Sequence, residues 1–223
     1  MIADVVFLFD VDNTMLDNDA FQDELRQHLR LAYGDRVDRR YWAIFQDLRV
    51  RHGYADYLAA LESLRLEEPH NARLLRLANW LLDYPFADRL YPGALETVRH
   101  VQRSGPAAIL SDGDAVFQSR KIERSGLWSA FNDNVLIYIH KQQELDAVER
   151  CYPAKHYVLV DDKLSILADV KTIWGDKVTT VFHRQGHYAL DNKTIERLRP
   201  ADITIDHIDE LTQLDLASPK SVE

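Results

Sequence analysis

Five short apolar runs along the chain each stop at a polar or charged residue. They are VVFLF before Asp10, AAIL before Ser111, VLIYIH before Lys141, YVLV before Asp161, and VTTVF before His183. Continuous apolar runs of this length, rich in β-branched and aromatic residues, are typical of strands that are buried on both faces. The pattern therefore predicts five buried strands, each followed by a polar side chain.

Helical periodicity separates the later four runs. It covers roughly residues 115–124, 143–151 and 164–174. Strands that alternate with helices in this way favour a parallel sheet with right-handed crossovers, and ligands of such sheets bind beyond the carboxyl ends of the strands. We therefore expect an α/β fold with a doubly wound parallel sheet. The polar residues that end the five runs should line one edge of it and face one crevice.

Residues 18–84 show a helical period and no convincing strand. Their apolar residues fall on three helical faces, namely Phe21, Leu25, Leu29 and Ala32; Tyr41, Ile44, Phe45 and Leu48; and Leu74, Leu75, Ala78, Leu81 and Leu82. This predicts a small α-helical domain at residues 17–87, inserted into a core domain formed by residues 1–16 and 88–216. The turn signal Tyr91-Pro92-Gly93 and a helix at 94–102 mark the return to the core. We expect residues 217–223 to be a frayed tail.

The composition removes several function classes. The 223 residues carry a net charge of −9, whereas a nucleic-acid surface needs a basic stripe, so we expect no nucleic-acid partner. The first apolar run is cut by Asp10 and follows no basic segment, which argues against a signal peptide or a membrane span. The single cysteine, Cys151, fits a helix position and a reducing compartment. We expect a cytoplasmic protein without a membrane partner, as a monomer or a homodimer.

Four carboxylates should converge at the sheet edge: Asp10, Asp12, Asp161 and Asp162. Two like charges about 4 Å apart repel by roughly 4 kcal/mol at an effective dielectric near 20, so such a cluster needs a cation or must keep some of its members protonated. A small number of carboxylate oxygens suits Mg²⁺, which keeps water ligands and shares the oxygens of a phosphate. Lys141 adds a fixed positive charge nearby.

These groups together describe phosphoryl transfer. Ser111 precedes a glycine-containing turn and a helix, and it can offer a hydroxyl and backbone N–H groups to an anion. Asp10 could attack phosphorus and form an acyl phosphate. Asp12 points the same way from an extended backbone, and it could protonate the leaving oxygen and then take a proton from the hydrolytic water.

The segment Asp10-Val11-Asp12-Asn13-Thr14, followed in order by Ser111, Lys141 and Asp161-Asp162, resembles the haloacid dehalogenase (HAD) superfamily of aspartate-nucleophile hydrolases. The stretch YPGALETVRHVQRSGPAAILSDGD is also similar to the approach to that family's second motif. The resemblance covers nearly the whole chain. It implies a Rossmann-like core with a helical cap, of the branch that contains small-molecule phosphatases and phosphoglucomutase-like enzymes.

The resemblance also implies a role for each motif residue. Asp10 is the nucleophile and a metal ligand, and Asp12 is the acid/base and gives its backbone carbonyl to the metal. Ser111 and Lys141 bind the phosphoryl group. The pair Asp161-Asp162 completes the Mg²⁺ site, with Asp162 favoured as the direct ligand and Asp161 acting through water. The expected substrate contacts are Asn13, Thr14, Asp112 and Gly113 beside the motifs, and Arg49 and His52 in the cap.

Two positions depart from the family's usual pattern. Asp112 stands where the family often has asparagine, and its charge disfavours a phosphate placed too close to it. Lys141 is followed by Gln142, where the family often has proline, and is preceded by His140. Neither departure removes a catalytic group, but both leave open which small phosphorylated metabolite is the substrate.

Structural roles compete with some of these assignments. A calcium loop at Asp10 and Asp12 would need glycine at Met15, so we reject that interpretation. The pair Asp161-Asp162 could cap the helix that begins near Leu164, which is compatible with metal binding.

Two basic segments have simpler interpretations as well. The helix dipole alone could account for the cluster of Arg49, Arg51, His52 and Tyr54 around Gly53. The segment FHRQGHYA, which contains His183, Arg184 and His187, follows the last predicted strand and could line the pocket, but we favour an ordinary surface loop.

The leading hypothesis is a Mg²⁺-dependent phosphatase that acts on a small phosphorylated metabolite through an aspartyl phosphate. A sugar-phosphate mutase would use the same residues and differ only in the acceptor of the phosphoryl group. A 2-haloacid dehalogenase shares the fold and the nucleophile but needs neither a metal nor the second aspartate, so Asp12 argues against it. The alternative from a different class is a non-catalytic phosphometabolite-binding module that keeps the pocket.

Overall fold

The computed structural model describes residues 2–190 and 195–216. Its centre is a six-stranded sheet in the order β3-β2-β1-β4-β5-β6, in which every neighbouring pair is parallel. The strands are β1 (Ala3–Phe9), β2 (Ala107–Asp112), β3 (Val135–Tyr138), β4 (Ala154–Asp161), β5 (Val178–His183) and β6 (Ile203–Ile205). The predicted α/β fold and its five strands are confirmed. The three-residue strand β6 was not predicted, because a run that short gives no usable pattern.

The strand order reverses direction beside β1. From β1 the chain builds outward through β2 and β3, and it then returns to pair β4 with the other side of β1. A reversal of this kind opens a crevice at the carboxyl edge of the sheet. Phe9, the last residue of β1, pairs with Ile109 on one side and Val160 on the other. Residues that follow Phe9 therefore lie between the ends of β2 and β4.

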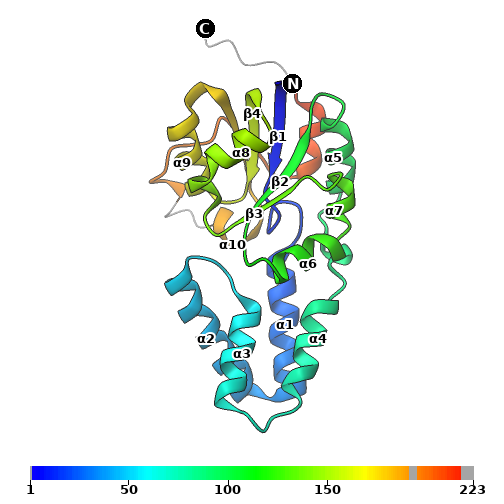
Figure 1. Ribbon diagram of the computed structural model, residues 1–223, viewed down its shortest axis with the longest axis vertical. Helices are drawn as coiled ribbons and strands as arrows, with labels where there is room; N and C mark the ends of the chain where they lie inside the picture. Colours follow the sequence, from blue (N-terminus) through cyan, green and yellow to red (C-terminus); the bar gives the residue numbers. More distant parts are fainter. Residues whose placement is uncertain (1, 191–194, 217–223) are drawn as a thin grey trace.

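Helices cover both faces of the sheet (Figure 1). Val5, Phe7 and Phe9 pack toward one face, and Val6 and Leu8 toward the other. The first face is covered by α5 (Ala94–Val101), α6 (Phe117–Arg124), α7 (Leu127–Ala130) and η4 (Ile208–Gln213), and the second by α8 (Leu145–Cys151) and α9 (Leu164–Trp174). Burial on both sides explains why β1 reads as one continuous apolar run. Shorter segments are η1 (Phe86–Arg89), η2 (Lys141–Gln143), η3 (Gly175–Lys177) and α10 (Gly186–Ala189).

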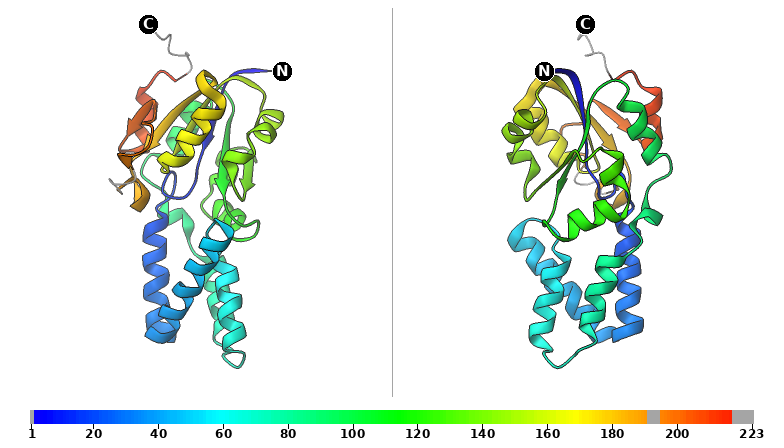
Figure 2. Two further views of the ribbon diagram at one scale, coloured as in Figure 1. Left: turned by 90° about the vertical axis from the view of Figure 1, so that its left-hand side faces the viewer. Right: turned by 45° about the vertical axis from the view of Figure 1, so that its right-hand side comes forward.

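Four helices between β1 and β2 make up what we call the helical insertion. They are α1 (Asn18–Tyr33), α2 (Asp35–His52), α3 (Tyr57–Glu67) and α4 (Leu74–Asp83), and all lie within the residues 17–87 predicted for the inserted domain. The insertion projects from the carboxyl edge of the sheet (Figure 1), and both views of Figure 2 show it standing apart from the sheet. Within the described ranges, every helix is too short or too polar to span a bilayer.

Local signals set the ends of these helices. Asp17 Oδ1 accepts a hydrogen bond from the backbone N–H of Ala20 at the start of α1, and Asp56 Oδ1 accepts one from Ala59 at the start of α3, both at 2.8 Å. These are N-cap contacts, which satisfy backbone donors that have no partner inside the helix. Gly53 ends α2 in the left-handed conformation, with φ of +82°.

The buried faces predicted for the helical insertion are largely confirmed. Phe21, Leu25 and Leu29 on α1 are 0% exposed. Leu75 is an exception, because it was expected on the buried face of α4 and is 54% exposed, whereas Leu77 is buried. The run LLRLANWLL carries apolar residues on more than one helical face, so its pattern did not fix which of them face the core.

Candidate active site

The carboxylates of Asp10, Asp161 and Asp162 meet at the carboxyl edge of the sheet. Asp10 directly follows β1, and its backbone N–H donates to Val160 O at 3.0 Å, which places it beside the end of β4. One oxygen of each carboxylate lies within 4.8 Å of the other two, and all three residues are buried. The structure therefore brings together three of the four carboxylates that the sequence predicted to converge, and the carboxylate of Asp12 has other partners.

Lys141 holds a buried ammonium against this cluster. Its Nζ lies 2.5 Å from Asp10 Oδ1 and 2.6 Å from Asp161 Oδ2. Burial opposes the charge of Lys141, but the nearby carboxylates of Asp10, Asp161 and Asp112 outweigh it and raise the pKa of the lysine above its usual range. The ammonium is therefore a permanent positive charge beside Asp10 at neutral pH.

Asp162 is the member of the cluster with the least compensation. Both of its carboxylate oxygens are buried and accept no hydrogen bond from the described residues, whereas Asp161 Oδ1 accepts one from the backbone N–H of Lys163 at 2.8 Å. Burial raises the pKa of the Asp162 carboxyl well above its usual range, and the charges of Asp161 and Asp10 raise it further. Buried carboxylate oxygens without donors are the ligands that a hard divalent cation neutralises, so this donor set fits Mg²⁺.

Three further predicted site residues, Thr14, Ser111 and Asp112, lie near the ends of β1 and β2. Thr14 Oγ1 donates to Asp10 Oδ2 at 3.4 Å, so the two oxygens of Asp10 face different partners. Ser111 is buried at the end of β2. Asp112 Oδ1 accepts a hydrogen bond from the backbone N–H of Lys141 at 2.8 Å, which fastens the segment that carries the lysine to the end of β2. The aspartate that departs from the family pattern thus has a structural partner.

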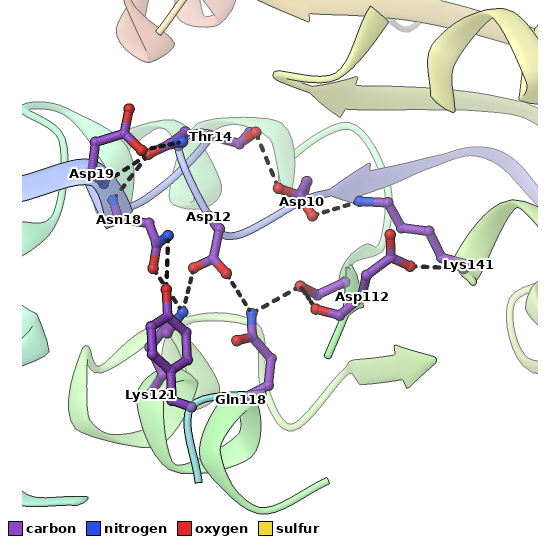
Figure 3. A network of polar contacts seen from close by, with 12 residues as sticks. Asp10, Asp12, Thr14, Asn18, Asp19, Asp112, Gln118, Lys121 and Lys141 are labelled. Atoms are coloured by element: carbon purple, nitrogen blue, oxygen red, sulfur yellow. Dashed lines mark hydrogen bonds and ion pairs between the residues drawn. The ribbon is translucent and has the colours of Figure 1, made fainter. Parts of the chain in front are cut away.

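Asp12 turns its carboxylate toward α6 (Figure 3). Its Oδ1 lies 2.7 Å from Lys121 Nζ, and its Oδ2 accepts a long hydrogen bond of 3.5 Å from Gln118 Nε2. The sequence reasoning missed both partners. Lys121 lies four residues after Phe117 and so shares a helical face with it, but the burial of both residues depends on packing against distant segments, which the sequence pattern does not indicate.

A cavity of about 290 Å³ lies between the helical insertion and the sheet edge. The core side includes Asp12, Asp112, His140, Asp162 and Lys163. The insertion side is formed by Asn18, Gln22, Phe45, Arg49, Gly53, Tyr54 and Ala55. The helical insertion and the core therefore form the cavity together.

Helix α10 links the two sides of this cavity. The ring of Tyr188 lies close to two cations, with Arg49 Cζ 5.3 Å and Lys163 Nζ 5.2 Å from its centroid. The backbone N–H of His187 donates to Asp19 Oδ2 at 2.7 Å, and its Nδ1 lies 2.7 Å from the other oxygen of Asp19. Because Arg49 and Asp19 belong to the helical insertion, these contacts tie it to the core beside the cavity.

The expected substrate contacts occupy different places. Asn13, Asp112 and Arg49 are among the residues that line the cavity. Asn13 also organises the chain locally, since its φ is +58° and its Oδ1 accepts a hydrogen bond from the backbone N–H of Asn18 at 3.0 Å. His52 is exposed, and its ring centroid lies 6.0 Å from that of Tyr54.

The segment after β5 differs from the surface loop that the sequence suggested. His183 is the last residue of β5, is 0% exposed and packs edge-on against Tyr91, with ring centroids 5.5 Å apart. His187 lines the cavity, while Arg184 is exposed and pairs with Asp206. The surface expectation is wrong for His183 and is confirmed for Arg184, while His187 is exposed and also lines the cavity. His183 is buried because strand β6 pairs with β5 as far as this residue and extends the sheet.

Comparisons with known proteins agree with this architecture. The family model described as haloacid dehalogenase-like hydrolase matches residues 5–165. A crystal structure from Burkholderia xenovorans LB400, described as a haloacid dehalogenase-like hydrolase, is 56% identical, with 96% of this chain and 97% of that chain covered and a TM-score of 0.92. No curated protein matches the chain.

Two more distant structures share the fold. An L-2-haloacid dehalogenase from Xanthobacter autotrophicus with chloropropionic acid covalently bound is 17% identical, covers 96% of this chain and 98% of its own, and has a TM-score of 0.62. A structure from Thermotoga maritima, described as a β-phosphoglucomutase, is 15% identical, covers 93% and 96%, and has a TM-score of 0.60. At these identities the likeness shows the fold alone.

Proposed function

Since this chain belongs to the haloacid dehalogenase-like hydrolase family, we propose that it is a Mg²⁺-dependent phosphatase that hydrolyses a small phosphorylated metabolite through an aspartyl phosphate. One observation carries the proposal. Asp10 lies in the buried acidic cluster beside Lys141, and a second carboxylate, Asp12, lines the cavity two residues later. A nucleophile with an acid/base beside it is what two-step hydrolysis of a phosphate ester requires.

The two carboxylates divide the reaction into balanced steps. In the first step an oxygen of Asp10 attacks phosphorus, the bond from phosphorus to the leaving oxygen breaks, and protonated Asp12 gives that oxygen its proton. In the second step water attacks the phosphorus of the acyl phosphate, Asp12 takes a proton from the water, and the bond from phosphorus to Asp10 breaks. Inorganic phosphate leaves, and both carboxyl groups return to their first state.

Fixed charges orient the nucleophile and balance the phosphoryl group. Lys141 and Thr14 contact different oxygens of Asp10, which fixes the plane of its carboxylate. Asp10, Asp161 and Asp162 would hold Mg²⁺, and the bound ion would supply positive charge that offsets the repulsion between the carboxylates and a phosphate. The Ser111 hydroxyl and the Lys141 ammonium are the proposed contacts to the transferred group.

A small substrate suits the shape of the site. The cavity of about 290 Å³ is lined by both the helical insertion and the core. A site closed by a movable element excludes water and favours small molecules over protein substrates. The insertion is therefore proposed to act as the cap of this enzyme, with Arg49 as its substrate contact.

The main competing activity is dehalogenation, because a structure with the same fold carries covalently bound chloropropionic acid. Such a reaction uses the aspartate nucleophile but needs neither a metal nor a second carboxylate. Here Asp12 lines the cavity, and Asp162 keeps both oxygens buried without donors among the described residues. These two features favour phosphate chemistry.

Release of inorganic phosphate from 4-nitrophenyl phosphate and from a panel of phosphorylated metabolites tests the proposal. The wild type should be active with Mg²⁺ and inactive with EDTA. Asp10→Asn should abolish turnover. Asp12→Asn should lower kcat by about 10² or more, also with 4-nitrophenyl phosphate, because Asp12 acts as the general base in the second step for every substrate and general acid–base catalysis contributes roughly that factor. Asp47→Asn, an exposed aspartate on α2, is the matched control and should keep full activity.

Three results would contradict the proposal. Turnover that survives in Asp10→Asn would exclude the aspartyl phosphate. Chloride release from 2-chloropropionate without Mg²⁺ would identify a dehalogenase. Conversion of a sugar phosphate to its isomer without free phosphate would identify a mutase.

A further inference from the structure

One face of α6 presents two polar side chains to Asp12. Gln118 and Lys121 are three residues apart and therefore neighbours on the helix surface. Lys121 Nζ lies 2.7 Å from Asp12 Oδ1, and Gln118 Nε2 lies 3.5 Å from Asp12 Oδ2. Both carboxylate oxygens of Asp12 are thus engaged by the same helix, as Figure 3 shows.

The ammonium of Lys121 contacts both oxygen acceptors and aromatic rings. Its side chain is 0% exposed, and Asn18 Oδ1 accepts a second hydrogen bond from its Nζ at 3.0 Å. The Nζ lies 5.6 to 5.9 Å from the ring centroids of four aromatic residues, Phe21, Tyr57, Phe86 and Phe117. Aromatic faces attract a cation, and two oxygen acceptors fix its direction, so the ammonium has few other positions.

Gln118 connects Asp12 to a second candidate catalytic residue. Its Nε2 donates to Ser111 Oγ at 3.0 Å, and the residue is 4% exposed. A Cβ at Gly113 would lie 2.8 Å from the Cβ of Gln118. The absence of a side chain at Gly113 therefore leaves space for the side chain of Gln118. The amide of Gln118 therefore sets the spacing between Asp12 and Ser111.

We propose that Lys121, assisted by Gln118, is a positioning residue that fixes the carboxylate of Asp12 at the cavity wall for proton transfer to the leaving oxygen; this rests on the function proposed above. The Asp12 side chain is 26% exposed and belongs to a loop, so these two contacts define its orientation. Because Asn18, Phe21 and Tyr57 lie on the helical insertion, the orientation of Asp12 also depends on the insertion being docked.

The kinetic test compares kcat/KM for substrates whose leaving groups differ in their need for a proton. Lys121→Met keeps an unbranched apolar side chain in the aromatic cage and removes the ammonium. For a series of aryl and alkyl phosphates, kcat/KM should fall about tenfold or more with the alkyl esters, whose leaving oxygen needs a proton. With 4-nitrophenyl phosphate it should fall less than about threefold, because nitrophenolate leaves without one. A merely structural role would lower all members of the series equally.

A double-mutant cycle shows whether Lys121 acts through Asp12. In the Asp12→Asn background, Lys121→Met should cause no further loss with the alkyl esters. Lys155→Met makes the same chemical change at an exposed lysine that pairs only with Asp4 among the described residues, so it is the matched control and should leave the series unchanged. A uniform loss across the series, or additive losses in the double variant, would overturn the proposal.

Crystal structures of the wild type and of Lys121→Met give a readout that does not depend on turnover. The wild type should show Asp12 in contact with Lys121 and Gln118, and the variant should show the carboxylate turned away or in several conformers. The same Asp12 orientation in both crystals would overturn the proposal. If the wild type hydrolyses no ester of the series, the proposed function fails, and the crystal structures still decide the positioning role.

Discussion

Lys141 and Asp10 are 131 positions apart in the chain, yet the lysine Nζ lies 2.5 Å from the aspartate Oδ1. The same ammonium reaches Asp161 Oδ2 at 2.6 Å. One lysine thus offsets part of the charge of three buried carboxylates. A buried charge that loses its partner costs several kcal/mol, so this contact affects the stability of the fold as well as the reactivity of the nucleophile.

Lys141→Met should therefore destabilise the protein when no metal is added. We expect the free energy of unfolding to fall by about 3 kcal/mol, because buried carboxylates are left without their cation. Added Mg²⁺ should recover part of the loss. Urea denaturation with EDTA and with Mg²⁺ measures both effects. Lys155→Met, which breaks an exposed pair with Asp4, is the control and should leave the urea midpoint unchanged; equal losses in the two variants would contradict the argument.

Mg²⁺ should stabilise the folded wild type. A ligand that binds only the folded state adds about 2.7 kcal/mol at a hundred times its Kd, so the Tm should rise with Mg²⁺ and then level off. Asp162→Asn should remove most of this rise, since the Asp162 oxygens have no donors among the described residues. Calorimetry with NaCl at matched ionic strength is the control. A wild-type Tm that does not change with Mg²⁺ would contradict the metal site, whether or not the protein shows phosphatase activity.

Gly53 sits where the helical insertion approaches His140 of the core. A Cβ at Gly53 would overlap Cε1 of the His140 ring, whereas a Cβ at Gly126 would have nothing within 4 Å. Both glycines are in the left-handed conformation, with φ of +82° and +81°, so alanine at either site should cost about 1 kcal/mol of stability. Only Gly53→Ala should also raise KM for 4-nitrophenyl phosphate, because it pushes the insertion away from the cavity. An equal KM in the two variants would show that this approach does not matter for binding.

The sheet and its acidic cluster could be predicted because each depends on a pattern that is local in the sequence. β1 and β4 read as apolar runs since both of their faces are buried, and the order of strands and helices fixes which strand ends share an edge. Asp10 and Asp161 then meet without any knowledge of side-chain packing. The carboxylate of Asp162 lies with these two.

The partners of Asp12 could not be predicted, because their burial depends on packing between distant segments. The sequence of α6, FQSRKIER, is polar enough to read as a solvent-exposed helix. Lys121 is buried only because rings from α1, α3, η1 and its own helix surround it. No local sequence pattern predicts that these four rings surround Lys121. The same limitation applies to His183, whose burial depends on the short strand β6.

The buried ring of His183 should make the folded protein less stable in mild acid. Burial lowers the pKa of its ring from the usual 6.5 to about 4. Between these values the unfolded chain binds a proton that the folded chain does not, so the contribution is complete above about pH 6.5 and is lost as the pH falls toward 4. Each pKa unit corresponds to about 1.4 kcal/mol, which gives a loss of about 2 kcal/mol between about pH 7 and pH 5.

His183→Phe keeps a flat ring against Tyr91 and should flatten this part of the pH dependence in urea denaturation. His70→Phe, at an exposed site, is the control and should retain the wild-type slope. If His183→Phe and the wild type lose stability in parallel over this range, the buried ring is not the group responsible.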